Sequence, residues 1–254
     1  MQIEGAKAIM VGGASGMCLA TAERFVARGG KVAILDQEKS DGAAVAKRLG
    51  GTFHPCHVAY YDAMAKVIDE AVAELGGVHF CLNTAGGGVQ TKTLSKDGKM
   101  HPIETFEGVV KLNLVASFNI NTNVARHMAL NEPNEDGERG VMINTSSIAA
   151  FEGQIGQVAY TAAKAGIAGM TLTMARDLGS LGIRVMTIAP SLFATGLTKG
   201  VTQEFADNLV RDAAFPKRMG KPDEFAIMAI AIFESAMMNG STLRVDAGQR
   251  FAPR

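Results

Sequence analysis

A tyrosine and a lysine four residues apart in the stretch YTAAK, Tyr160 and Lys164, have the types and spacing for proton transfer. The surrounding segment has a helical pattern, and residues four apart share one face of a helix. A phenol with its ordinary pKa of about 10 is a poor base at neutral pH, and a nearby cation lowers that pKa. The pair can therefore exchange a proton with an alcohol or ketone. Alone it is weak evidence, because such spacing also arises by chance.

Two further polar residues stand in strongly apolar surroundings. Ser147 ends the run GVMINTSS, thirteen residues before Tyr160. Its hydroxyl has the chemistry to polarise a substrate oxygen, and a helix cap or turn is the alternative role. Asn113, in KLNLVAS, lies within an apolar helical segment. There the alternative is a core amide that the backbone satisfies.

A glycine-rich stretch near the N-terminus, VGGASGMCLAT (residues 11–21), follows a short apolar run. Gly12 and Gly16 allow positive φ and a close approach of the backbone to a ligand. The N–H groups at the start of the helix that follows would face a pyrophosphate, with support from the helix dipole. A glycine pattern alone is weak evidence for a nucleotide site, because turns use glycine too.

An acidic residue strengthens the nucleotide interpretation. Asp36 ends the second apolar run, about twenty residues past the glycine loop, where a carboxylate accepts hydrogen bonds from a ribose diol. Gln37 and Glu38 follow it, and no arginine occurs before Arg48. This composition favours NAD over NADP, whose 2′-phosphate would meet negative charge. A helix cap or strand-end turn is the alternative role of Asp36.

These residues need a scaffold, and the chain alternates short apolar runs with longer helical patterns. The runs predict seven strands, at residues 7–12, 31–36, 52–58, 78–83, 140–147, 183–190 and 241–248. Helical patterns cover residues 16–28, 40–49, 61–75, 104–130, 157–180 and 222–236. The alternation predicts an α/β fold with a doubly wound parallel sheet, helices on both faces and one domain over residues 1–254.

Long loops indicate where ligands enter. We expect residues 1–150 mainly to bind the nucleotide, and the loops at 86–102 and 190–216 to form the substrate side. Both loops follow strands, and the carboxyl ends of parallel strands are the usual place for a site. The loop at 131–140 leads into a strand, so we expect it at the opposite edge of the sheet.

Composition narrows the class of partner. The 254 residues include 25 basic and 25 acidic side chains, and 47% are hydrophobic. Without a basic surplus or cluster, we expect no nucleic-acid or membrane partner. The N-terminus shows no secretory signal and no apolar run suits a membrane span, which predicts a cytoplasmic protein. Cys18, Cys56 and Cys81 show neither a disulfide framework nor metal-like spacing, so we expect reduced thiols and no metal.

In their order and spacing across the whole chain, these motifs and NTAG (residues 83–86) resemble the short-chain dehydrogenase/reductase family. The resemblance implies a Rossmann-like fold and hydride transfer between NAD(P) and an alcohol or ketone. It implies that Tyr160 is the general acid/base and that Lys164 lowers the pKa of Tyr160 and holds the nicotinamide ribose. Ser147 would orient the substrate oxygen, and Asn113 would hold a water that links Lys164 to solvent. The dinucleotide would contact Gly12, Ser15, Gly16, Met17, Asp36, Gln37, His57, Val58, Asn83, Thr84, Ala85, Gly86, Tyr160, Lys164, Pro190, Phe193 and Thr195.

Longer stretches, among them NEPNEDGERGVMINTSS and the ending LRVDAGQRF, resemble the type-2 3-hydroxyacyl-CoA dehydrogenases. That resemblance implies NAD, a homotetramer and an acyl-CoA substrate, with Gln154 and Gln157 lining the substrate pocket. Lys92, Lys96 and Lys99 would suit the phosphates of CoA, and solvated loop lysines are the alternative. A steroid or a small cyclic or aromatic alcohol is the alternative substrate. A non-catalytic nucleotide-binding protein is the third interpretation.

Four positions depart from the family pattern, and they cluster at the cofactor. Cys18 replaces the third glycine of the loop, so its side chain points toward space that a pyrophosphate or the neighbouring strand would use. His57 replaces an aspartate that would hold the adenine amino group, and a neutral imidazole would accept one hydrogen bond instead. Ser191 replaces a glycine, and Thr84 is a milder change. We therefore predict an intact catalytic centre with a weakened NAD pocket, which Cys18→Gly with His57→Asp would tighten.

Overall fold

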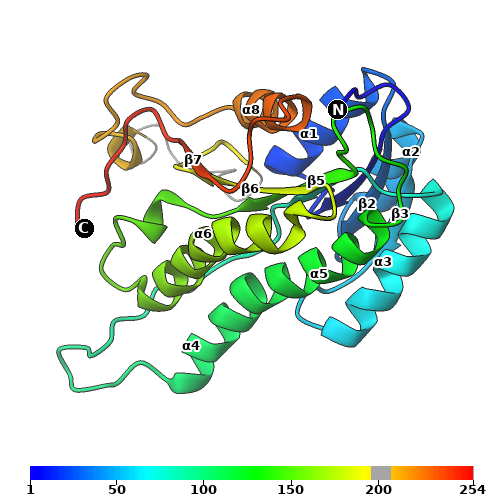
Figure 1. Cartoon of the computed structure of the whole chain (residues 1–254). Coiled ribbons are helices and arrows are strands. Elements are labelled where there is room, and N and C mark those ends of the chain that lie inside the picture. Colours follow the sequence, from blue (N-terminus) through cyan, green and yellow to red (C-terminus); the bar gives the residue numbers. More distant parts are fainter. Residues whose placement is uncertain (196–206, 254) are drawn as a thin grey trace.

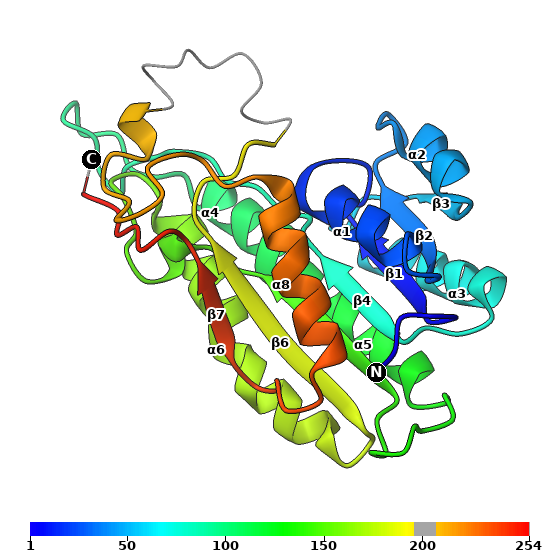
Figure 2. The same ribbon diagram turned by 90° about the horizontal axis from the view of Figure 1, so that it is seen from above.

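The carboxyl ends of seven parallel strands meet at one edge of a sheet in the computed structural model, which describes residues 1–195 and 207–253 (Figure 1). The strands are β1 (Lys7–Val11), β2 (Lys31–Asp36), β3 (Thr52–Pro55), β4 (Phe80–Asn83), β5 (Gly140–Thr145), β6 (Ile183–Pro190) and β7 (Thr242–Val245). Their order is β3-β2-β1-β4-β5-β6-β7, with β3 and β7 at the edges (Figure 2). All neighbouring pairs are parallel. The predicted fold class is confirmed.

Five strands are shorter than the apolar pattern predicts, namely β1, β3, β4, β5 and β7. The apolar pattern predicts strands that are too long, because residues beyond the last paired position are also buried. After β3 ends at Pro55, Val58 is still buried but lies on the wall of a cavity rather than in the sheet. After β5 ends at Thr145, Ser147 keeps an extended backbone (φ −163°) and carries its side chain into the loop.

Helices cover both faces of the sheet. Helices α1 (Gly16–Val26), α2 (Gly42–Leu49) and α8 (Pro222–Glu234) lie on one face (Figure 1). Helices α3 (Tyr61–Leu75), α5 (Ala116–Met128) and α6 (Val158–Gly179) lie on the other, and α4 (Ile103–Val110) packs against α6. This is the doubly wound arrangement that the alternating pattern predicts.

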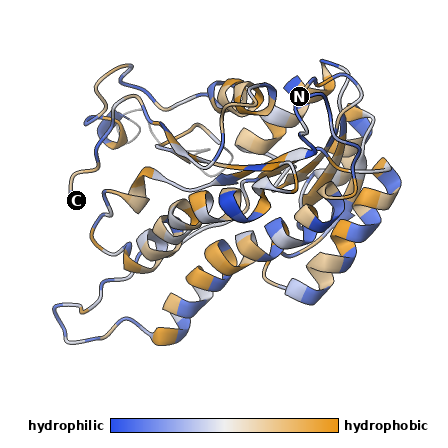
Figure 3. Cartoon of the chain, viewed as in Figure 1, coloured by the Kyte–Doolittle hydropathy of each residue, from blue (hydrophilic) through white to orange (hydrophobic). Residues whose placement is uncertain are grey.

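The core divides into two apolar clusters, one on each face of the sheet. On the α1 and α8 face, the rings of Phe25, Phe80 and Phe233 pack together, with centroids 5.2–5.5 Å apart. The central strands between the layers are mostly apolar (Figure 3), and all eight residues of β6 are buried. A sheet buried on both faces holds its strand ends rigidly, which fixes the edge where the loops gather.

The predicted helix at 104–130 contains one irregular turn, the π-helix η1 (Lys111–Val115) between α4 and α5. The amide of Asn113 donates to the carbonyl of Val109 at 2.8 Å. In a regular α-helix that carbonyl would accept the Asn113 backbone N–H, so the side chain competes with the backbone bond. π-Helical turns often occur at functional sites, and apolar periodicity does not reveal them.

The loop at 131–140 lies at the amino-terminal edge of the sheet, as predicted. Asn131 donates to the carbonyls of Val78 at 2.6 Å and Arg139 at 2.8 Å, which precede β4 and β5. In the part of the chain that the structure describes, no helix combines the length and apolar composition needed to cross a membrane. The same residues bring together no cluster of three histidine, cysteine or acidic side chains suited to a metal ion.

Candidate active site

A cavity of about 350 Å³, here called the nucleotide cavity, opens at the carboxyl edge of the sheet. Its walls come from the residues that follow β1, β2, β3 and β4 and from the start of α1. In open α/β sheets, ligands bind in a crevice at this edge. Residues predicted to contact a dinucleotide form most of the wall: Gly12, Ser15, Gly16, Met17, Asp36, Gln37, His57, Val58, Thr84, Ala85, Gly86 and Thr195. The wall also includes three residues that the sequence did not single out, Leu35, Cys56 and Leu112.

The glycine loop takes backbone conformations that favour glycine. Gly12 has φ +78° and Gly16 has φ +57°. A Cβ on Gly12 would also lie 3.0 Å from Thr84 Oγ1 and 3.1 Å from the backbone nitrogen of Ala85. The first turn of α1 contains no acidic side chain, and its N–H groups have no partner within the helix. The loop therefore fits a pyrophosphate.

Asp36 takes the strand-end role that the sequence left open, and its ribose-binding role stays a prediction. One carboxylate oxygen accepts the N–H of Ala14 at 2.9 Å, and the other accepts the N–H of Gln37 at 2.7 Å. These bonds fix the carboxylate as a strand-end turn residue. Each oxygen has a second lone pair, so the carboxylate can still accept hydrogen bonds from ribose hydroxyls in the cavity.

Ser147 and Tyr160 form a hydrogen-bonded pair beyond the cavity. Ser147 Oγ accepts the N–H of Ala149 at 3.1 Å and so caps the 3₁₀ helix η2 (Ile148–Ala150). The same hydroxyl hydrogen-bonds the phenol of Tyr160, near the start of α6. Burial raises the pKa of Tyr160 above its ordinary value, and the bond from Ser147 partly offsets that increase. The phenol is therefore protonated at neutral pH, as a proton donor must be.

Lys164 lies one turn along α6 and is only 4% exposed. Its Nζ donates to the carbonyl of Thr145 at 2.8 Å and lies 5.6 Å from the centre of the Tyr160 ring. Burial lowers the pKa of Lys164 to about 8. The net shift of the Tyr160 pKa is upward because burial is its largest cause, so the expected lowering by the charge of Lys164 stays a prediction.

Asn113 joins the cavity to the tyrosine and lysine. Its amide donates to the carbonyl of Gly87 at 2.7 Å, and its Oδ1 accepts the Gly87 N–H at 3.1 Å. Gly86 lines the cavity, and a Cβ there would collide with Asn113 Oδ1 and lie 3.4 Å from Lys164 Nζ. The side chain is thus the backbone-satisfied amide of the alternative interpretation. The water that it was expected to hold stays a prediction.

The sequence model described as short chain dehydrogenase matches residues 6–206, most of the chain. The chain belongs to the short-chain dehydrogenase family. Membership confirms that the protein is an oxidoreductase. Within this family fold, the nucleotide cavity and the Ser147, Tyr160 and Lys164 cluster are adjacent parts of one site that meet at Gly86.

Individual relatives cover this short-chain dehydrogenase from end to end. The human 3-hydroxyacyl-CoA dehydrogenase type-2 is 44% identical over 254 residues, which is 99% of this chain and 97% of that protein. The crystal structure of the Mycobacterium avium 3-hydroxyacyl-CoA dehydrogenase type-2 superposes with a TM-score of 0.94 at 40% identity, covering 98% of each chain. A 7α-hydroxysteroid dehydrogenase complexed with NADH and 7-oxo glycochenodeoxycholic acid gives a TM-score of 0.87 at 26% identity, covering 100% of this chain and 97% of the other. The NADH in that structure agrees with the predicted cofactor.

Some residues predicted for this short-chain dehydrogenase lie off the cavity wall. The buried amide of Asn83 donates to Ser117 Oγ at 3.0 Å and accepts the Ala85 N–H at 3.1 Å, so it supports the wall from behind. Pro190 is buried at the end of β6. The side chain of Phe193 packs in the core, where a Cβ on Gly220 would overlap it, so only its backbone is available to a nicotinamide. Residues 196–206 of the predicted 190–216 loop lie outside the described residues.

A second cavity of about 520 Å³, here called the outer cavity, lies between the 86–102 loop and the turn after η2. Gln154 lines it together with Lys92 and Thr161. Gln157 is not on its wall, but its amide donates to Gln154 Oε1 at 3.3 Å. Of the two predicted substrate residues, one therefore faces a cavity and the other holds the first in place.

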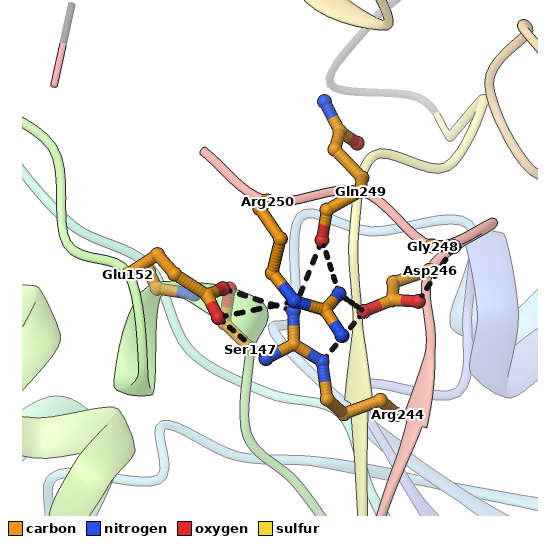
Figure 4. A network of polar contacts seen from close by, with 8 residues as sticks. Ser147, Glu152, Arg244, Asp246, Gly248, Gln249 and Arg250 are labelled. Atoms are coloured by element: carbon orange, nitrogen blue, oxygen red, sulfur yellow. Dashed lines mark hydrogen bonds and ion pairs between the residues drawn. The ribbon is translucent and has the colours of Figure 1, made fainter. Parts of the chain in front are cut away.

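An ion-pair network braces the turn between Ser147 and Tyr160 (Figure 4). Arg244 of β7 donates to both carboxylate oxygens of Glu152, at 2.7 and 2.9 Å, and its Nε donates to Asp246 at 2.6 Å. Such bidentate pairs have a fixed geometry. The turn is thereby tied to the last strand of the sheet. Local sequence does not reveal this role of Arg244, because Glu152 lies 92 residues away along the chain.

Cys18 is fully buried and does not line the nucleotide cavity. Its Sγ lies 3.9 Å from the carbonyl of Leu82 in β4, and burial raises the pKa of the thiol far above its ordinary range. The sequence allowed the Cys18 side chain to point toward a pyrophosphate or toward the neighbouring strand. In the structure it lies against the strand. Ser191 needs no glycine-like backbone, because its φ is not positive. Neither Cys18 nor Ser191 lines the nucleotide cavity.

His57 does line the nucleotide cavity. Its Nδ1 accepts the backbone N–H of Ala59 at 3.3 Å, and its ring packs on Tyr60 with centroids 4.7 Å apart. In this arrangement Nδ1 is engaged by the backbone, so the expected hydrogen bond from adenine to the imidazole stays a prediction. Of the four departures, His57 and Thr84 line the cavity, and His57 is the larger change in what a ligand meets.

One further residue at the reacting end was missed. A Cβ on Gly88 would lie 2.8 Å from Cδ2 of Tyr160. Any residue other than glycine at position 88 would therefore force the Tyr160 ring or the loop backbone to move. The triple glycine GGG at 86–88 is the sequence signal, but it also suits an ordinary flexible loop.

Proposed function

We propose that this oxidoreductase interconverts 3-hydroxyacyl-CoA and 3-ketoacyl-CoA with NAD(H). The observation that carries the proposal is the contact at Gly86, where the nucleotide cavity meets Asn113 and Lys164. One end of a dinucleotide bound there would lie beside the proton-transfer residues. The full-length similarity to 3-hydroxyacyl-CoA dehydrogenases supports the substrate.

The residues of the nucleotide cavity fit NAD. Gly12 and Gly16 leave room for the pyrophosphate, and Asp36 has lone pairs for the ribose diol. Asp36 disfavours NADP because its charge would repel a 2′-phosphate. Tyr160 and Lys164 would hold the nicotinamide ribose. When bound, NAD supplies the hydride acceptor, and NADH supplies the donor.

Three side chains handle the substrate oxygen. In ketone reduction, Tyr160 gives its phenolic proton to that oxygen, and the Ser147 hydroxyl holds the oxygen by a hydrogen bond. The charge of Lys164 then stabilises the phenolate left behind. In alcohol oxidation the proton travels back, so Tyr160 must first be deprotonated. Asn113 keeps the adjacent backbone of Gly87 in place throughout.

The outer cavity supports a substrate with a long, charged arm. Lys92 lines it, and Lys96 and Lys99 lie on the same exposed hairpin. Lys99 is engaged with Asp97 at 2.8 Å, so Lys92 is the better candidate for a CoA phosphate. The steroid alternative rests on the likeness to the 7α-hydroxysteroid dehydrogenase.

Steady-state kinetics with NADH separate the two substrates. We expect kcat/KM for acetoacetyl-CoA to exceed that for a cyclic ketone or an oxosteroid by at least about tenfold. Lys92→Gln should raise KM for acetoacetyl-CoA but not for acetoacetyl-pantetheine, which lacks the nucleotide phosphates. Lys47→Gln, at an exposed position of α2, is the matched control. Turnover of the steroid without turnover of the thioester would overturn the acyl-CoA proposal.

We further propose that the enzyme is a cytoplasmic homotetramer. Large apolar side chains are exposed on its helices, among them Phe118 of α5 at 52% and Leu172 of α6 at 47%. Contiguous exposed apolar surface is typical of a subunit interface. Light scattering should give four times the mass of the chain, and Phe118→Glu should reduce that mass. A wild-type monomer would contradict the proposal.

A further inference from the structure

The segment that follows β7, residues 246–253, supports one wall of the outer cavity. The carbonyl of Ala252 accepts Nε2 of Gln154 at 3.3 Å, and the carbonyl of Pro253 accepts the N–H of Ile155 at 3.0 Å. Gln154 and Ile155 both line the outer cavity. The position of that wall therefore depends on what holds the segment after β7.

The segment is bound on its other side to the chain that precedes α8. The side chain of Gln249 is 1% exposed, and its Nε2 donates to the carbonyl of Leu209 at 2.7 Å. The carbonyl of Ala247 accepts the N–H groups of Ala214 at 2.9 Å and Phe215 at 3.1 Å. Ala247 has φ +54°, a value that no other non-glycine residue shares in the described part of the chain. Such a backbone persists only where neighbouring contacts hold it.

Two arginines connect Gln249 to the cavity wall. The backbone carbonyl of Gln249 accepts Arg244 at 3.0 Å and Arg250 at 2.7 Å, and in Figure 4 the Gln249 side chain points away from both. Arg244 also holds both carboxylate oxygens of Glu152, two residues before Gln154. Gln249 is thus held by its side chain in one direction and by its carbonyl in the other, so its position fixes the arginines and the turn that they bind.

We propose that Gln249 is a positioning residue for the substrate, which holds the Gln154 wall of the outer cavity in place for the arm of an acyl-CoA. This inference rests on the proposed function, which places that arm in the outer cavity. Without the Gln249 amide, the carbonyl of Leu209 loses its donor and the segment after β7 loses a buried contact. A wall that must become ordered when the arm binds weakens that binding. Gln249 does not line the nucleotide cavity, so the binding of NADH should be unaffected.

The experiment measures kcat and KM for acetoacetyl-CoA with NADH, together with the Kd for NADH. Gln249→Met keeps the length of the side chain without its amide, and Gln249→Asn keeps an amide on a shorter side chain. Gln2→Met is the matched control, because Gln2 is exposed and lies beside Glu138 and His79, away from the carboxyl edge of the sheet.

We expect Gln249→Met to raise KM by about fivefold, with kcat and the Kd for NADH within about twofold of the wild type. Gln249→Asn should raise KM by a smaller factor, and Gln2→Met should match the wild type. An unchanged KM, or a fall in kcat or NADH affinity as large as the rise in KM, would overturn the positioning role and leave the proposed function intact. Absence of acetoacetyl-CoA turnover in the wild type would overturn the proposed function and the inference with it. If Gln249→Met does not fold, Gln249→Asn decides the question.

Discussion

The two ends of the site are built differently. At the reacting end, Lys164 and Asn113 are buried, and each is held by backbone carbonyls. At the base end, His57 is exposed and is held by one backbone N–H and one ring contact. A change at the first end leaves a buried polar group without a partner, whereas a change at the second mainly alters what the ligand meets.

The difference explains where departures from the family pattern are tolerated. Burial sets the chemistry of the reacting end, because it raises the pKa of Tyr160 and lowers that of Lys164. Both shifts depend on close packing, so the residue types there have little freedom. At the base end, the His57 side chain is exposed, so its residue type is less constrained by packing. Substitutions at the reacting end should therefore have larger effects on rate than those at the base end.

The largest effect is expected for Tyr160→Phe. Loss of the phenolic hydroxyl removes the proton donor, so kcat for ketone reduction should fall by about 10²- to 10⁴-fold. Because one hydrogen bond to the nicotinamide ribose is also lost, the Kd for NADH should rise, but by no more than about tenfold. Tyr61→Phe is the matched control, because that phenol donates to the carbonyl of Lys111 on the surface and should leave kcat unchanged. Equal activity of wild type and Tyr160→Phe would place proton transfer elsewhere. A wild type that binds NADH without any turnover would favour the non-catalytic interpretation.

The second effect concerns pH. Lys164 is charged below its pKa of about 8 and neutral above it. Because the charge stabilises the phenolate that forms in ketone reduction, kcat for reduction should fall as the pH rises through 8. The measurement is kcat at saturating substrate from about pH 6.5 to about pH 9.5. Lys164→Met should be slow throughout and show no step near pH 8. A wild-type rate that stays flat or rises would contradict this role of the charge.

Much of the site was predictable because its residues follow predicted strands. Ser147 after β5, Asp36 at the end of β2 and the glycine loop after β1 all reach one edge once the sheet is parallel. Tyr160 and Lys164 share a helix face by spacing alone. For these residues, knowing the order of elements was enough to place the side chains.

The remaining features depend on contacts between distant segments. No local pattern distinguishes whether the Cys18 thiol faces the cavity or β4, since both lie beside the start of α1. The direction of the pKa shift at Tyr160 depends on burial, which spacing does not report. The tautomer of His57 depends on one N–H two residues away. The sequence does not decide these features, because each depends on which of several neighbouring groups makes the contact in the folded chain.

The third prediction concerns the free energy of unfolding that is lost by burying the Lys164 side chain. Burial lowers the pKa of Lys164 to about 8 in the folded chain, from its ordinary value of 10.5. The unfolded chain therefore binds more protons between these values, and stability rises with pH across that window. Lys164→Met removes the cost, so it should stabilise the enzyme at pH 7 by on the order of 2 kcal/mol, with a gain that shrinks toward pH 10. Urea denaturation at several pH values measures it, with exposed Lys66→Met as the control. A destabilised Lys164→Met would mean that the bond to Thr145 outweighs desolvation.

The smallest effect on ligand binding is expected for Cys18→Gly, the change that the family pattern suggests as a repair. The thiol fills core space against β4 and is not on the cavity wall. Removing it leaves a small void and places glycine inside α1, so stability should fall by about 1.5 kcal/mol. The Kd for NADH should stay within about twofold of the wild type. Cys18→Ala keeps the helix propensity and should recover part of the lost stability with the same Kd. Tighter NADH binding in Cys18→Gly than in Cys18→Ala would show that the side chain at position 18 displaces the glycine loop. The packed reacting end and the tolerant base end would then be coupled through α1.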